Sequence, residues 1–153
     1  MKIRDYQHTD STEIADLFHT AVHAIDDKLY NSHQREAWAP SPPNYHFWEE
    51  RLALKKPFVA YTDEGIVGFI ELEEDGHIDC LYVHKDYQGK GVAAGLLHYL
   101  CVVAKTQGIK QLYVEASAPA MLFFKKQGFS IQGKNAVELR GEVLENFSMS
   151  RGL

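Results

Sequence analysis

The chain has 153 residues, of which 45% are hydrophobic, and its formal net charge is −5. This length is typical of one domain and allows a sizeable core, so we predict a single domain over residues 1–153. The acidic balance argues against a nucleic-acid partner, because such binding depends on clustered Lys and Arg side chains. The first ten residues lack the apolar segment of a secretory signal, and no apolar run reaches the roughly 20 residues that span a bilayer. These features predict a cytoplasmic protein without a membrane partner, and they leave a monomer or a homodimer open.

Neither the cysteines nor the histidines form a complete metal-binding motif. Cys80 and Cys101 each lie in an apolar run without CxxC spacing, which predicts buried reduced thiols. His19 and His23 have the i, i+4 spacing that can hold a metal, but no glutamate stands between them as in HExxH. We therefore predict no metal in this protein.

The first part of the chain combines a short strand with amphipathic helices. Apolar residues recur at helical spacing after Asp10 and Ser11, whose side-chain oxygens can cap a helix. Prolines at positions 40, 42 and 43 interrupt the helical pattern that follows. The predicted order is a strand at residues 3–6, a helix from residue 11, and two short helices within residues 30–38 and 45–54.

After Pro57 the pattern changes to strands joined by acidic turns that contain glycine, as in a meander. A long helix then runs to Gly108, and Pro119 opens a short helix that Gly128 ends. The predicted strands in this part are residues 58–62, 66–72, 77–83, 111–115, 130–139 and 142–150, with the last two forming a hairpin. The order predicts an α/β (α+β) fold with a mixed sheet and helices on both faces.

A glycine-rich turn, residues 88–93, separates the strand at 77–83 from the long helix. Backbone N–H groups that converge without side chains at a helix N-terminus predict a phosphate-binding site. The turn is not a nucleotide-binding GxxxxGK[ST] motif, because Val92 follows Gly91, and it is not GxGxxG, because Ala94 takes the place of the last glycine. A GxG pair alone is as often an ordinary turn as a phosphate-binding one. The motifs around it therefore decide between these two interpretations.

Residues 78–93 resemble motif A of the GNAT superfamily of acetyltransferases, whose turn reads (Gln/Arg)-x-x-Gly-x-(Gly/Ala). Gln88, Gly91 and Ala93 occupy its defining positions. Residues 112–114 and 120–129 resemble motif B, and they end in Gly-Phe as that motif does. The resemblance covers nearly the whole chain, and its two ends are similar to a small bacterial branch, the YafP-like acetyltransferases. It implies a mostly antiparallel seven-stranded sheet that splays between strands 4 and 5.

The resemblance also implies an N-acetyltransferase that moves an acetyl group from acetyl-CoA directly to a primary amine of a small molecule or a protein. The cofactor's pantetheine arm would pair with the fourth strand, where a backbone N–H near Leu81 would polarise the thioester carbonyl. Its pyrophosphate would lie on residues 88–93. The implied cofactor-binding residues are Leu81, Tyr82, Val83, Gln88, Gly89, Lys90, Gly91, Val92, Ala93, Ser117 and Phe124.

The second motif departs from the family at two positions. Phe124 stands where many relatives have a tyrosine that protonates the departing thiolate, and Ser117 stands where many have asparagine. A CoA thiol with a pKa near ~8.5, by analogy with cysteine, still leaves at neutral pH, so catalysis can survive this loss. A solvent proton, Ser117, Tyr82 or Tyr30 are the alternative acids. A CoA-binding sensor with lost or weak catalysis is the alternative function.

Carboxylates on the strands that should separate are candidates for the general base. Asp79 is the first choice, because burying a carboxylate in a central strand is costly without a task or a partner. Glu115, Glu71 and Glu73 are the others, and a purely structural role is equally open for each. The predicted catalytic residues are Asp79, Glu115 and Tyr82.

Aromatic residues before the strand meander predict a wall of the substrate pocket. Aromatic rings beside acidic groups can bind an amine by cation–π contact, although some rings in this segment would belong to the core. The predicted substrate-binding residues are Tyr30, Trp38 and Asn146.

Overall fold

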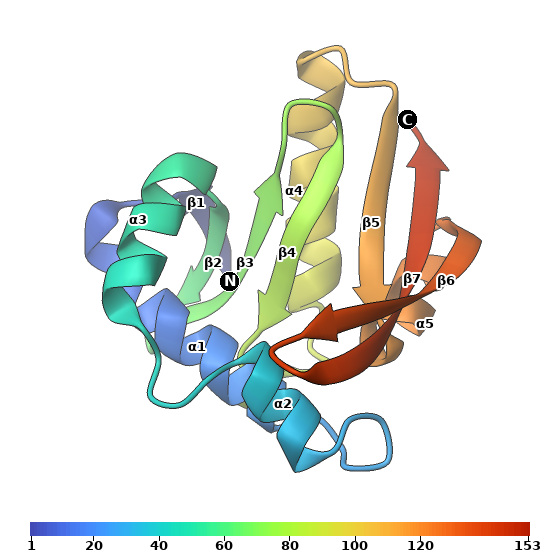
Figure 1. The fold of residues 1–153 in the computed structure, drawn as a ribbon. Helices are drawn as coiled ribbons and strands as arrows, with labels where there is room; N and C mark the ends of the chain where they lie inside the picture. Colours follow the sequence, from blue (N-terminus) through green and yellow to red (C-terminus); the bar gives the residue numbers. More distant parts are fainter.

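The computed structural model describes residues 1–153, and Figure 1 shows its single seven-stranded sheet. The strand order is β1-β2-β3-β4-β5-β7-β6, and every neighbouring pair is antiparallel except β4 and β5. The elements are β1 (Lys2–Asp5), η1 (His8–Asp10), α1 (Ser11–His23), α2 (Ser32–Trp38), α3 (Tyr45–Lys55), β2 (Phe58–Thr62), β3 (Gly65–Leu72), β4 (His77–Val83), η2 (Lys85–Tyr87), α4 (Val92–Thr106), β5 (Gln111–Ser117), α5 (Ala118–Lys126), β6 (Ser130–Leu139) and β7 (Glu142–Gly152). The predicted mixed, mostly antiparallel sheet is confirmed.

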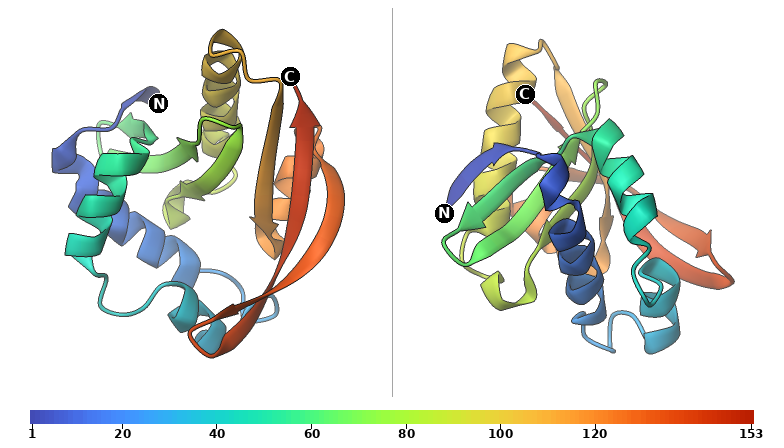
Figure 2. Two further views of the ribbon diagram at one scale, coloured as in Figure 1. Left: turned by 45° about the horizontal axis from the view of Figure 1, so that its top comes forward. Right: turned by 90° about the vertical axis from the view of Figure 1, so that its left-hand side faces the viewer.

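Helices cover both faces of the sheet, as predicted (Figure 2). On one face, α4 and α5 bury Leu96, Leu100 and Phe124 against the strands. On the other face, α1 and α3 bury an aromatic and aliphatic cluster that includes Ile14 and Trp48. Removing such side chains from water is the main stabilising contribution to a domain of this size. No helix has both the length and the apolar character needed to span a bilayer.

The start of α1 differs from the prediction in its capping. Asp10 occupies the N-cap position, but its side chain makes no capping bond to α1. Its carboxylate instead accepts hydrogen bonds from the Arg4 guanidinium at 2.7 and 2.9 Å and from the Gln7 backbone at 2.9 Å. The strand β1 thus supplies the cation that allows this carboxylate to be buried. A short-range sequence pattern does not reveal such a partner.

Two histidines form hydrogen bonds within the protein, and both cysteines are free thiols. His19 Nε2 lies 2.8 Å from Ser41 Oγ, and His23 Nε2 lies 2.8 Å from the Ala39 carbonyl oxygen. Both rings therefore hold the loop that precedes α3. The predicted free thiols are confirmed, with Cys101 buried and Cys80 half-buried on β4.

The helix α4 approaches the sheet closely at Gly68 of β3. A Cβ atom at this position would lie 2.9 Å from a Val92 methyl group and 3.1 Å from the Tyr82 carbonyl oxygen. A side chain at this position would force the helix or the strand to shift, so glycine permits this contact. The approach holds the first turn of α4 beside the end of β4.

The parallel strands β4 and β5 separate after a short pairing. They pair only at His77 with Tyr113 and at Ile78 with Val114, whereas β5 pairs with β7 along its whole length. The register between β3 and β4 also shifts between the pairs Ile70–Leu81 and Leu72–Ile78, which gives β4 one extra residue. This bulge bends β4 away from β5 and leaves its last residues without a partner on that side. The predicted splay is confirmed, but the bulge was not predicted.

Candidate active site

The glycine-rich turn between η2 and α4 exposes its backbone. Gly89 and Gly91 have φ angles of 71° and 83°, a left-handed conformation that favours glycine. A Cβ atom at either position would meet no atom within 4 Å, so the backbone conformation and not crowding requires glycine here. Gly91 is the N-cap of α4, and no side chain caps the first N–H groups of this helix. These free amides at a helix N-terminus suit a phosphate group.

Two side chains of the turn make contacts within the protein. Gln88 donates its side-chain amide to the Val83 carbonyl oxygen at 2.9 Å, which ties the turn to the end of β4. Lys90 places its Nζ 5.2 Å from the centre of the Tyr87 ring. Both residues therefore shape the turn, and their backbone N–H groups are what they offer to a ligand.

A first cavity of about 670 Å³ runs from this turn to the unpaired part of β4. Ala21 in the last turns of α1 and the following residues Ala24 and Ile25 also line it, which the sequence did not indicate. The cavity brings together the predicted cofactor-binding residues Leu81, Tyr82, Val83, Gln88, Gly89, Gly91, Val92, Ala93 and Ser117. Among the predicted set, Lys90 and Phe124 do not line it.

Phe124 lies in the core beside Phe123 and Phe129, with ring centroids 5.2 and 5.1 Å away. Its exposed fraction is only 2%. The Phe124 side chain borders a second cavity and not the first. The residue thus supports the fold of this region and supplies no proton donor.

The second cavity, of about 200 Å³, lies between the separated strands and the hairpin β6–β7. It brings together every predicted catalytic and substrate-binding residue, namely Asp79, Glu115, Tyr82, Tyr30, Trp38 and Asn146. Asn146 also accepts a hydrogen bond from the Asn135 amide at 2.9 Å, which orients its own side chain. Residues far apart in the sequence therefore face one space.

Trp38 and Tyr82 stand where three cavities meet. Both line the first and second cavities, and both line a third cavity of about 490 Å³ beside α1, α3 and the loop at residues 39–44. Trp38 donates its Nε1–H to the Tyr82 hydroxyl at 3.1 Å. The Tyr82 proton has no acceptor in the protein, and burial raises the pKa of this hydroxyl well above its ordinary value. A hydroxyl that can still donate therefore stands at the junction.

The glycine turn, the splayed strands and the joined cavities fit the comparisons with known proteins. Residues 26–145 match the family described as the acetyltransferase (GNAT) domain. The chain belongs to the GNAT family of N-acetyltransferases. It is 34% identical over 149 residues to the uncharacterised N-acetyltransferase YafP of Escherichia coli K12, with 97% of this chain and 94% of YafP covered.

Two solved structures of the GNAT family show the same fold. A GCN5-related N-acetyltransferase from Rhodopseudomonas palustris is 33% identical and has a TM-score of 0.93, with 99% of this chain and 95% of that chain covered. A phosphinothricin acetyltransferase from Sinorhizobium meliloti, solved in complex with acetyl-CoA, is 18% identical and has a TM-score of 0.74. The match covers 99% of this chain and 88% of that one. The predicted family and fold are thereby confirmed.

Within this acetyltransferase, Tyr30 is nearly fully buried and its hydroxyl is fully used. The hydroxyl donates to the Glu145 carbonyl oxygen at 2.7 Å and accepts from the Ala118 backbone N–H at 3.0 Å. These two bonds join β7 to the first turn of α5. The hydroxyl therefore positions the walls of the second cavity and has no remaining proton for a substrate.

We expect Tyr30→Phe to lower the free energy of unfolding by about 2 kcal/mol, because two backbone groups lose a partly buried partner. Urea unfolding followed by circular dichroism measures this change. Tyr45→Phe is the matched control, since its hydroxyl binds Asp16 at an exposed site and its loss should change stability little. Equal effects of the two substitutions would contradict the structural role of Tyr30.

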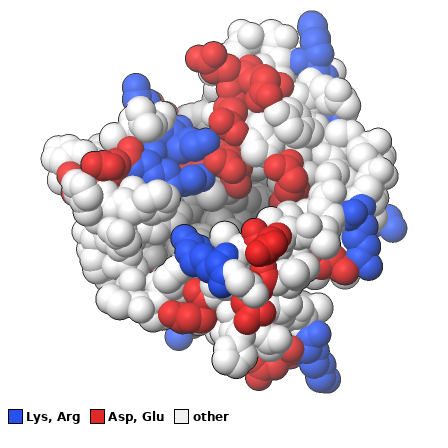
Figure 3. Space-filling view, in the orientation of Figure 1, with Lys and Arg blue, Asp and Glu red and all other residues white.

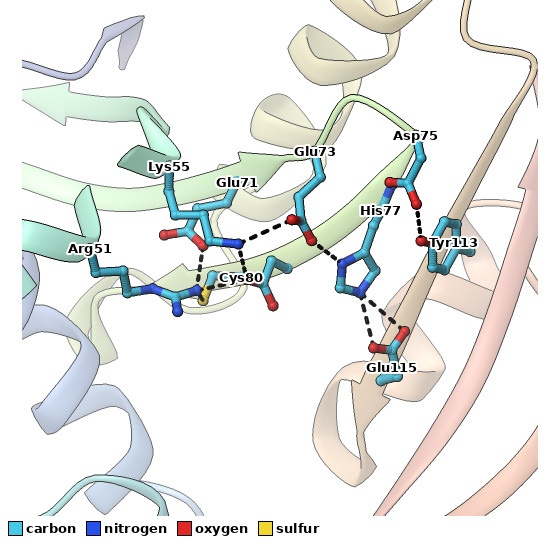
Figure 4. A network of polar contacts seen from close by, with 10 residues as sticks. Arg51, Lys55, Glu71, Glu73, Asp75, His77, Cys80, Tyr113 and Glu115 are labelled. Atoms are coloured by element: carbon cyan, nitrogen blue, oxygen red, sulfur yellow. Dashed lines mark hydrogen bonds and ion pairs between the residues drawn. The ribbon is translucent and has the colours of Figure 1, made fainter. Parts of the chain in front are cut away.

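A network of charged side chains begins beside the second cavity of the acetyltransferase (Figure 4). Asp79 lies 2.7 Å from Lys55 Nζ and 2.9 Å from Arg51 Nη2. Glu71, whose exposed fraction is 0%, lies 2.7 Å from the same Arg51 atom. Burial acts to raise the pKa of Asp79, but the Lys55 hydrogen bond and the Arg51 charge outweigh it and hold that pKa below its usual value. Asp79 is therefore a partnered carboxylate and a weak base.

His77 links this network to Glu115. Its Nδ1 lies 2.5 Å from Glu73 and its Nε2 lies 3.0 Å from Glu115. Ionised carboxylates only accept hydrogen bonds, so the doubly protonated ring is the form that satisfies both contacts. Burial acts to lower the pKa of His77, but the hydrogen bonds to the two glutamates and the Glu115 charge outweigh it and raise that pKa. The imidazolium thus orients Glu115, a role that the sequence did not indicate.

The Glu73, His77 and Asp79 side chains also lie close enough to one another to consider a metal ion, with donor atoms within 4.8 Å. Lys55 Nζ stands 3.2 Å from Glu73 and 2.7 Å from Asp79, so an ammonium group already occupies the position between the two carboxylates. The cluster is therefore balanced by the protein's own cations.

Proposed function

We propose that this acetyltransferase moves an acetyl group from acetyl-CoA directly to a primary amine of a small molecule or a protein. The observation that carries the proposal is the junction at Trp38 and Tyr82, where the cavity from the phosphate-binding turn meets the cavity with the carboxylates. A donor held at the turn and an amine held by the carboxylates would meet there. The relative from Sinorhizobium meliloti was solved with acetyl-CoA, which supports this choice of donor.

The cofactor would be held by backbone groups of this chain. Leu81, Tyr82 and Val83 lie on the part of β4 that has no strand partner toward β5, so the pantetheine arm can pair there like an added strand. The N–H groups of residues 88–93 would hold the pyrophosphate. A backbone N–H near Leu81 would polarise the thioester carbonyl, as an oxyanion hole does.

Glu115 is our choice for the general base. Asp79, the first choice from the sequence, carries two cationic partners, and these stabilise its charged form against accepting a proton. Glu115 is more exposed than Asp79, lines the second cavity and has one cationic partner, His77, where Asp79 has two. It can accept the proton that an ammonium substrate must lose before attack, directly or through water. Asp79 then stabilises the network of charged side chains and adds negative potential to the second cavity.

We expect Glu115→Gln to lower kcat/KM by about 100-fold, with the largest loss at low pH, where the amine arrives protonated. Asp79→Asn should keep the wild-type shape of the pH profile. Release of free CoA from acetyl-CoA with any accepted amine, measured from about pH 6 to about pH 9, separates the two carboxylates. A changed profile in Asp79→Asn alone would transfer the role of the base to Asp79.

The departing thiolate needs a proton donor, and Phe124 supplies none. Tyr82 stands at the junction with a free hydroxyl proton, and we assign it to hydrogen-bond the leaving sulfur. The Ser117 hydroxyl also borders the first and second cavities and is the alternative, together with solvent. The Tyr30 hydroxyl is excluded from this role because it already donates to Glu145.

A screen of amines for free-CoA release in the presence of acetyl-CoA tests the proposed function. Titration calorimetry with CoA provides the companion measurement. CoA binding without release from any amine would favour the alternative, a CoA-binding sensor. A cytoplasmic location, one domain over residues 1–153 and a monomer or homodimer are part of the proposal.

A further inference from the structure

The second and third cavities carry opposite charges. The charged residues that line the second cavity are acidic: Asp79, Glu115 and Glu145. The charged residues that line the third cavity are Arg51 and Arg140, and no carboxylate borders it. Figure 3 shows a hollow at the centre of this face with Lys and Arg side chains toward its left and Asp and Glu side chains toward its right. The two cavities are continuous in their lining, because both include Trp38, Cys80 and Tyr82.

Arg140 is a cation without a carboxylate partner. Its Nη1 donates to the Ala37 carbonyl oxygen at 2.6 Å, and its other guanidinium nitrogens have no acceptor in the protein. It also has a φ of 47° in the two-residue turn between β6 and β7, a position that favours asparagine or glycine. A charged side chain held in an unfavourable backbone conformation at the mouth of a cavity suggests a functional use.

Arg51 offers a second cationic group to the same cavity. All its side-chain contacts to Glu71, Asp79 and Cys80 use Nη2. Figure 4 shows these contacts meeting at one nitrogen of the guanidinium. Its Nη1 has no protein acceptor, so this atom can still donate to an anion.

Aromatic rings form the walls between the two charged ends. Phe18, Phe47 and Trp48 line the third cavity together with the shared Trp38 and Tyr82. Phe47 is 52% exposed, so a ligand in this cavity can contact its ring. Stacked or edge-to-face contacts with such rings favour an aromatic ligand.

We infer that the acceptor is a primary alkyl amine that carries an aromatic ring, with an anionic group at the end remote from the amine. This inference rests on the proposed function for its amine end, which would enter the acidic cavity beside Glu115. The ring would lie between Trp38, Tyr82 and the third-cavity aromatics, and Arg140 would bind the anion. An α-amino acid fits less well, because its amine and carboxylate share one carbon and cannot reach opposite ends.

The test compares para-(aminomethyl)benzoate with para-(aminomethyl)benzamide, a neutral analogue of the same shape. The wild type should acetylate the benzoate with a kcat/KM about 10-fold above that of the benzamide, since only the anion forms a bidentate ion pair with the guanidinium. Arg140→Gln should abolish this preference, Arg140→Lys should keep part of it, and Lys110→Gln, a cation away from the cavities, should keep all of it.

Equal kcat/KM values for the two probes in the wild type, or a preference that survives in Arg140→Gln, would overturn the inference. Binding gives an independent readout, because the chain's two tryptophans, Trp38 and Trp48, both line the third cavity. Quenching of tryptophan fluorescence that favours the benzoate without any acetyl transfer would support this site and refute the proposed function. Acetyl transfer to both probes without a preference would support the proposed function and refute this site.

Discussion

Gly91→Asp is expected to weaken CoA binding by about 100-fold, the largest loss of affinity for any single substitution in the glycine turn. The new carboxylate would stand at the N-cap of α4, where we place the cofactor's pyrophosphate. Two negative groups about 4 Å apart near a protein surface repel each other by about 4 kcal/mol, which is enough for this loss. The protein should remain folded, because a negative charge is favourable at a helix N-terminus.

Gly91→Asn is the matched control, since asparagine has the size of aspartate and tolerates the left-handed conformation but carries no charge. Titration calorimetry with CoA at low and high salt measures both variants. The additional loss in Gly91→Asp should shrink at high salt, where exposed charges are screened. Unchanged CoA affinity in a folded Gly91→Asp variant would contradict the placement of the pyrophosphate.

Arg51→Met is expected to lower the free energy of unfolding by about 3–5 kcal/mol, because it leaves the buried carboxylate of Glu71 without a cation. The double variant Arg51→Met with Glu71→Gln should recover most of this loss, since it removes the unpaired charge. Urea unfolding of both variants measures the difference. Lys55→Met is a control with a smaller expected loss, because Asp79 and Glu73 are partly exposed and Asp79 keeps Arg51.

The loss of unfolding free energy caused by Arg51→Met should also depend on pH. Burial raises the pKa of Glu71 in the folded protein, and the loss of Arg51 raises it further. A group with a folded pKa above its unfolded pKa favours folding at low pH, and this contribution is lost as the pH rises through the folded pKa. Unfolding at about pH 5 should therefore show a smaller deficit than at about pH 7. A deficit that is the same at both pH values would contradict the assignment to Glu71.

The order of the strands, and their bounds to within two residues, could be predicted because they depend on local signals. The strand at His77–Val83 is found with its predicted bounds, since an acidic turn that contains glycine precedes it. The final strand extends to Gly152, two residues beyond the prediction, because it pairs with Gln111 at the start of β5. The Asn31–Gln34 capping box at the start of α2 is a further local signal of this kind.

The candidate site could be predicted only in part. The residues of the glycine turn and the facing strands lie where the family resemblance implies, because that motif determines the path of the backbone. The partners of the carboxylates could not be found in this way, since Arg51 reaches Asp79 across 28 residues and His77 reaches Glu115 across 38. Such long-range pairs follow from packing and leave no periodic pattern in the sequence. The cationic neighbours of Asp79 are therefore the reason that Glu115 is the proposed base.

The docking of α2 on the hairpin β6–β7 has an evolutionary consequence. Tyr30 and Gln34 donate to the carbonyl oxygens of Glu145 and Val143, and Arg140 donates to that of Ala37. Every residue type supplies such a carbonyl, so the docking places no demand on the side chains of the hairpin other than that of Arg140. Related copies of this enzyme can therefore exchange the apolar hairpin side chains that line the second cavity, Val137, Leu139 and Leu144, and diverge in substrate while the scaffold persists.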